Sequence, residues 1–147
     1  MQYGIRRRDS TIPGAGKGVF ATAFIPDGHW ICPYVGESIN QNCLESRYPG
    51  DQVAPYAVDD GRRRYIDSAC LRGIGSIANG LFDAAGSSRP QDQHNAIIEA
   101  RPDGSRWLRA TRDIPDGSEI FVWYGDAYTL EDNHQTKRRR RDDTRPC

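Results

Sequence analysis

The chain has 147 residues, of which 37% are hydrophobic, and its 20 basic and 20 acidic side chains leave it formally neutral. This length suits one domain with a single core and excludes two domains of ordinary size. No stretch approaches the roughly 20 apolar residues of a membrane span, and no apolar run follows the arginines of residues 1–10, so we expect neither a membrane segment nor a secretory signal.

The cysteines predict neither a metal site nor a disulfide framework. Cys32, Cys43, Cys70 and Cys147 form no CxxC pair, and no histidine lies at zinc-ligand spacing from any of them. A disulfide-rich fold of this length would contain more cysteines. We therefore expect reduced thiols, an intracellular protein and no bound metal.

Turn motifs divide the chain into short segments. The tripeptide Pro-Asp-Gly occurs at 26–28, 102–104 and 115–117. Proline presets the first turn residue and glycine accepts a positive φ, so each tripeptide is expected to separate two extended segments. Residues 21–28 also resemble residues 110–117, which predicts two related strand–turn–strand units, one near each end of the domain.

Further short strands are expected between these turns. Segments rich in β-branched and aromatic residues and bounded by turn residues predict strands at 53–58, 64–67, 95–100 and 105–111. Residues 70–81 have room for one or two helical turns, and no segment predicts a long helix. The fold class is therefore mostly β, with many short strands.

The end of the chain is polar and charged. Residues 131–147 show no apolar periodicity and predict a basic, disordered tail. The basic run at 137–141 fits a nuclear address, a weak and nonspecific nucleic-acid contact, or a plain solvated tail. Because the whole chain is neutral, the remainder is slightly acidic. That charge suits a lysine-rich partner, although solubility alone would explain it as well.

Three motifs carry candidate chemistry, and each has a plainer explanation when taken alone. The first, residues 14–18 (GAGKG), lets backbone approach a ligand closely, but a tight turn accounts for it too. The second, residues 76–80 (SIANG), contains an ordinary Asn-Gly turn pair. In the third, residues 119–128 (EIFVWYGDAY), an apolar strand ends at Tyr124 with Tyr128 four positions on, which core packing also explains.

The order of these motifs, with residues 34–37 (YVGE) between the first two, resembles the SET-domain family of protein lysine methyltransferases. The closing motif is most similar to the PR branch of that family. The resemblance covers residues 5–128 and implies a SET-type fold of several small β-sheets with a threaded, pseudoknot-like C-terminal segment, within a domain over residues 1–130. It also implies methyl transfer from S-adenosylmethionine to a lysine of a protein. The usual substrate in the family is a histone tail, in the nucleus of a eukaryotic cell or host.

The resemblance also assigns roles to individual residues. Tyr124 matches the tyrosine at the methyl-transfer point, Tyr56 matches the second tyrosine of the lysine channel, and Val122 lies in the same channel. Because Val122 stands where Phe or Tyr is common, the resemblance implies space for more than one methyl group. The cofactor-binding positions are Ala15, Gly16, Lys17, Gly18, Asn79, Gly80, Tyr124 and Tyr128.

Two positions depart from the family pattern and leave alternatives open. Gly80 stands where the family has the His of an Asn-His pair, and Ser76 stands where it has an Arg. The alternative function is therefore a catalytically silent SET/PR module that binds a protein partner, and cofactor binding distinguishes the two. A third class is a nucleic-acid-binding protein that uses the tail with the arginines at 6–8 or 62–64.

Overall fold

The computed structural model describes residues 3–50, 57–59, 62–69, 71 and 73–124. The expected tail lies outside these residues. The described elements, in chain order, are β1 (Ile5–Asp9), β2 (Lys17–Ala21), β3 (Trp30–Pro33), β4 (Glu37–Asn40), α1 (Gln41–Arg47), β5 (Ala57–Asp59), β6 (Arg64–Asp67), the 3-10 turns η1 (Ile74–Ile77) and η2 (Gln91–Gln93), β7 (Ala96–Ala100), β8 (Arg106–Ala110), β9 (Glu119–Ile120) and β10 (Val122–Trp123).

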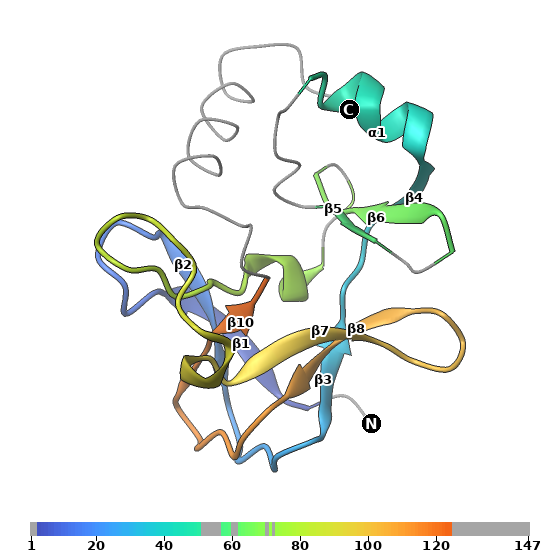
Figure 1. The fold of residues 1–147 in the computed structure, drawn as a ribbon. Helices are drawn as coiled ribbons and strands as arrows, with labels where there is room; N and C mark the ends of the chain where they lie inside the picture. Colours follow the sequence, from blue (N-terminus) through green and yellow to red (C-terminus); the bar gives the residue numbers. More distant parts are fainter. Residues whose placement is uncertain (1–2, 51–56, 60–61, 70, 72, 125–147) are drawn as a thin grey trace.

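The strands form three small sheets, which confirms the expected mostly β fold (Figure 1). Their orders are β1-β2-β9, β10-β7-β8-β3 and β4-β6-β5. The third sheet and α1 form an insert that lies apart from the other two sheets in Figure 1. Only β10 and β7 pair in parallel among the named strands of the described part.

The three Pro-Asp-Gly turns form as the sequence predicts. Gly28, Gly104 and Gly117 have φ angles of 82°, 86° and 85°, a left-handed conformation that favours glycine. The turns separate β2 from β3, β7 from β8, and β8 from β9. The first and third turns lie side by side, because Ile25 and Ile114 exchange backbone hydrogen bonds of 2.9 and 2.8 Å just before them.

The two related units pack against each other with local two-fold symmetry. The N–H of Gly28 donates to the carbonyl of Ala110 at 2.9 Å, and at the equivalent positions the N–H of Gly117 donates to the carbonyl of Ala21 at 2.8 Å. This reciprocal pattern confirms the repeat. It also fixes β9 beside β2, so the glycine-rich loop and the closing segment meet.

The closing segment runs between two distant parts of the chain. On one side, Phe121 bridges Asn79 in parallel, and the N–H of Val122 donates to the Asn79 carbonyl at 2.8 Å. On the other side, the N–H groups of Asn95 and Ala96 both donate to the Phe121 carbonyl at 3.1 Å. This arrangement agrees with the threaded segment that the SET resemblance implies.

One apolar core joins the first two sheets. Burial raises the pKa of its thiol, Cys32, to about 12, which keeps that group protonated. In the described part of the chain no helix is long and apolar enough to cross a membrane. The core residues are Val19, Ala21, Ile25, Ile31, Cys32, Tyr34, Ala78, Ala96, Leu108, Ala110, Ile114, Ile120 and Val122.

Candidate functional site

The glycine-rich loop needs its glycines for two different reasons. Gly14 and Gly16 have φ angles of 78° and 75°, and a Cβ at either position would meet nothing within 4 Å. At Gly18 a Cβ would instead overlap the Glu119 carboxylate, 2.9 Å from Cδ. The ammonium of Lys17 pairs with Asp9, so this side chain is directed along β1.

Glu119 is a buried carboxylate that ties the start of the chain to the closing segment. Glu119 is only 5% exposed. It lies opposite Phe20 in the antiparallel pairing of β9 with β2. One oxygen, Oε1, accepts from the Ser10 hydroxyl at 2.7 Å. The other, Oε2, accepts from the Thr11 N–H at 2.8 Å and from its hydroxyl at 2.6 Å. These bonds hold residues 10–18 in a fixed loop.

Asn79 is in contact with this loop. Its Nδ2 donates to the Lys17 carbonyl at 3.0 Å and to Glu119 Oε1 at 3.2 Å. The candidate cofactor residues of the loop and of the Asn-Gly segment are therefore in direct contact. Ser76, where the family has Arg, lies in η1 and donates its hydroxyl to the Gly73 carbonyl at 3.0 Å.

Tyr124 lies beside the Asn-Gly pair. Its hydroxyl donates to the Ala78 carbonyl at 2.6 Å, one residue before Asn79. A Cβ at Gly80 would lie 3.5 Å from Tyr124 Cδ2 and 3.2 Å from the Val122 carbonyl, so glycine lets these segments pack closely. The structure thus brings Tyr124, Asn79, Gly80 and the glycine loop into one site.

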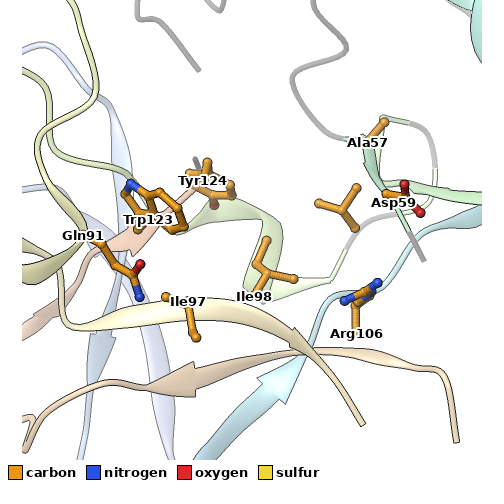
Figure 2. Close-up of a pocket in the computed structure, with 9 residues that line it drawn as sticks. Ala57, Asp59, Gln91, Ile97, Ile98, Arg106, Trp123 and Tyr124 are labelled. Carbon is orange, nitrogen blue, oxygen red and sulfur yellow. The ribbon is translucent and has the colours of Figure 1, made fainter. Parts of the chain in front are cut away.

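A cavity of about 350 Å³ lies beside Tyr124, between the insert and β7 (Figure 2). Its walls are mixed: in Figure 2, Trp123 and Tyr124 lie on one side of Ile98, and the charged residues Arg106 and Asp59 lie on the other. Within the described residues, Arg106 Nε and Trp123 Nε1 have no hydrogen-bond partner. The lining residues are Ala57, Val58, Asp59, Gln91, Ile97, Ile98, Arg106, Trp123 and Tyr124.

Among the predicted site residues that the structure describes, Tyr124 alone lines this cavity. Tyr56 and Tyr128 lie outside the described residues. Val122 is fully buried in the core, and its neighbour Trp123 lines the cavity instead. In a strand, successive side chains point to opposite faces, which explains the exchange.

His94 anchors the long loop that follows the Asn-Gly pair. It is 1% exposed; its Nε2 accepts from the Leu81 N–H at 2.9 Å and its Nδ1 donates to the Pro90 carbonyl at 3.0 Å. Burial lowers the pKa of His94, with smaller contributions in the same direction from Arg112 and Arg89. The neutral ring, protonated on Nδ1, therefore closes both ends of the loop.

A second buried carboxylate holds the elements of the insert together. Asp67 is fully buried and accepts from Arg47 Nη1 at 3.1 Å and from the Tyr48 hydroxyl at 3.0 Å. Arg47 also donates to Glu37 at 2.9 Å, and this hydrogen bond raises the pKa of the guanidinium. Strand β5, which pairs with β6 in the same insert, supplies one wall of the cavity.

Comparison with known proteins gives a consistent result. The SET domain family model matches residues 16–125. Human PRDM6 is 28% identical over 137 residues, which cover 82% of this chain and 20% of that protein. The Caenorhabditis elegans histone-lysine N-methyltransferase set-17 is 29% identical over 126 residues, covering 86% of this chain and 42% of the relative. The chain therefore spans less than half the length of these relatives.

Solved structures of polycomb repressive complex 2 from Chaetomium thermophilum share the fold. A crystal structure of that complex matches with a TM-score of 0.69 and 22% identity, over 87% of this chain and 16% of the other. An autoinhibited form bound to S-adenosylmethionine matches with a TM-score of 0.67 and 20% identity, over 96% and 17%. Together with the family match, the fold and the meeting of the glycine loop, Asn79 and Tyr124 show that the chain belongs to the SET domain family.

Proposed function

We propose that this domain transfers a methyl group from S-adenosylmethionine to a lysine side chain of a protein. The observation that carries the proposal is the position of Tyr124. Its hydroxyl is held 2.6 Å from the Ala78 carbonyl, next to the Asn79 contact with the glycine loop, and its ring lines the cavity. A cofactor at the loop and a lysine in the cavity would therefore meet at Tyr124.

The residues of the loop side fit the cofactor. The backbone of Ala15, Gly16, Lys17 and Gly18 would hold its amino-acid part together with Asn79 and Gly80, and Tyr128 is proposed to pack on its adenine. No side chain fills the space over Gly16, where a Cβ would meet nothing within 4 Å. The chemistry that S-adenosylmethionine supplies when bound is a methyl carbon on a sulfonium, which an uncharged amine can attack.

The residues of the cavity side would prepare the lysine. A lysine amine is protonated at neutral pH and has no lone pair to donate, but an apolar channel disfavours the charged form and lowers its pKa. Trp123, Ile98 and Tyr124 supply such walls. The Tyr124 hydroxyl, oriented by the Ala78 carbonyl, would then align the neutral amine, with Tyr56 as the proposed second tyrosine.

The relative set-17 is named a histone-lysine N-methyltransferase. We therefore propose histone tails as the first substrates to test and the nucleus as the location. The sequence expectation of space for more than one methyl group does not follow from the structure, because Val122 is fully buried in the core and lies outside the cavity lining. Mass spectrometry of the product measures how many methyl groups are added.

A matched pair of tyrosine variants tests the proposed activity. Histone-tail peptides are incubated with S-adenosylmethionine carrying a deuterated methyl group, and labelled lysine is measured by mass spectrometry. We expect Tyr124→Phe to lower the rate at least about tenfold, because a well-placed hydrogen bond contributes about 1.5 kcal/mol or more. Tyr65→Phe loses a hydroxyl that donates to Gln41 in the insert and should keep the rate. Equal rates for both variants would refute the role of Tyr124.

A further inference from the structure

The orientation of the Asn79 amide is fixed by its neighbours. A carboxamide has two N–H donors on Nδ2 and one acceptor oxygen. Both acceptors that meet this side chain, the Lys17 carbonyl at 3.0 Å and Glu119 Oε1 at 3.2 Å, are groups that only a nitrogen can satisfy. A flipped amide would place its oxygen against two other oxygens. Asn79 Oδ1 must therefore point away from Glu119 and remain an acceptor for something else.

In the described part of the chain, only uncharged groups donate hydrogen bonds to the Glu119 carboxylate. Its partners are two hydroxyls, one backbone N–H and one carboxamide. Among the described residues no Lys, Arg or His forms an ion pair with it, and the residue is 5% exposed. A buried carboxylate without a counter-ion raises the local preference for a cation. Asn79 Nδ2 lies 3.2 Å from this carboxylate, so a cation held at Asn79 would lie near it.

These two observations point to one ligand group. We propose that Glu119 is a positioning residue that holds Asn79 so that its Oδ1 accepts a hydrogen bond from the α-ammonium group of the cofactor, while the Glu119 charge favours that cation. The inference rests on the proposed use of S-adenosylmethionine and adds the residue that selects its amino-acid part. Gly18 is part of the same arrangement, because any Cβ at position 18 would overlap the Glu119 carboxylate.

Calorimetry with two ligands tests the inference. The first ligand is S-adenosylhomocysteine, and the second is its analogue that lacks only the α-amino group. The wild-type domain should bind the first at least about tenfold more tightly, the expected effect of one charge-assisted hydrogen bond. Glu119→Gln should weaken the first ligand about tenfold and leave the second within about twofold, so that the preference disappears.

The control is Glu99→Gln, which removes a half-exposed carboxylate paired with Arg109 and should change neither affinity. A general loosening of the site would weaken both ligands alike, so a loss specific to S-adenosylhomocysteine separates positioning from support of the fold. If Glu119→Gln does not fold, Glu119→Asp, which keeps the carboxylate but withdraws it by one methylene, should reduce the preference, and a folded Glu119→Asp variant that keeps the full preference refutes the role of Glu119.

Two results would overturn the inference in distinguishable ways. Wild-type protein that binds both ligands equally, or a folded Glu119→Gln variant that keeps the preference, refutes the role of Glu119 and leaves the methyltransferase proposal standing. Folded wild-type protein that binds neither ligand refutes the proposed function and this inference with it.

Discussion

Adding one methyl group at Gly18 should damage the site more than adding one elsewhere in the same loop. The Cβ of Gly18→Ala would overlap Glu119 Oε1, and it would lie 2.9 Å from Glu119 Cδ and 3.2 Å from Asn79 Nδ2. The carboxylate must then move and lose part of its four hydrogen bonds. Overpacking costs about 1–3 kcal/mol and each bond to a charged group about 1.5–3 kcal/mol, so we expect a total of about 3 kcal/mol.

Thermal unfolding followed by circular dichroism measures this cost. At about 4 °C per kcal/mol for a domain of this size, Gly18→Ala should lower Tm by about 12 °C. Gly14→Ala is the matched control, because its φ is 78° and its Cβ would meet nothing within 4 Å. The left-handed backbone alone costs about 1–2 kcal/mol, or about 4–8 °C.

A double variant identifies the cause of the effect. In a Glu119→Ala background the new Cβ at Gly18 has no carboxylate to displace, so the cost of Gly18→Ala should fall by at least about 1 kcal/mol. Equal Tm values for Gly18→Ala and Gly14→Ala, or a cost at Gly18 that is unchanged in the Glu119→Ala background, would refute the close approach of Glu119 to this glycine.

Three further predictions concern the loop, the insert and the cavity. Because burial lowers the pKa of His94 below its unfolded value of about 6.5, the unfolded state binds the proton first, and the free energy of unfolding should decrease as pH falls from about 7 to 5. Urea titrations should find this slope reduced in His94→Gln. Arg47→Met should cost about 3 kcal/mol in the same assay, because it leaves the buried Asp67 without its cation; a cost below about 1 kcal/mol would contradict this. Ile98→Trp should fill the cavity and lower methyl transfer at least about tenfold, while calorimetry shows unchanged S-adenosylmethionine affinity; loss of both would place the cofactor in the cavity instead.

The features of the fold that were predicted correctly from the sequence depend on local residue preferences. The Pro-Asp-Gly turns depend on the dihedral preferences of their own residues, so they form wherever the tripeptide occurs. The repeat of residues 21–28 at 110–117 predicted related units, although their reciprocal hydrogen bonds became visible only in the structure. Helix α1 was missed because none of its residues is buried and no apolar periodicity marks it. Its one signal was Asn40, whose side chain caps the helix through the Cys43 N–H at 2.8 Å.

The sequence pointed to the parts of the candidate site that lie in recognisable motifs. It did not point to the parts that depend on how distant strands pair. The glycine loop, Asn79 and Tyr124, to which the SET resemblance assigns a shared site, lie close together in the structure, and their roles stay a prediction. Glu119 was not singled out, because one acidic residue in an apolar strand also fits a solvent-facing position. Its role depends on contacts with Ser10 and Thr11, more than 100 positions away. Trp123 was missed for a related reason, since only the pairing of β10 with β7 decides which face lines the cavity.

The proposed methyl transfer requires that the folded domain binds S-adenosylmethionine at the glycine loop and Asn79. The most direct measurement is isothermal titration calorimetry of S-adenosylmethionine into the wild type and into Asn79→Ala, with folding of both checked by circular dichroism. We expect one saturable site in the wild type and at least about tenfold weaker binding in the variant, which loses a hydrogen bond to a charged group. A folded wild type that gives no binding would contradict the methyltransferase assignment and favour a SET module that acts only by binding a protein partner.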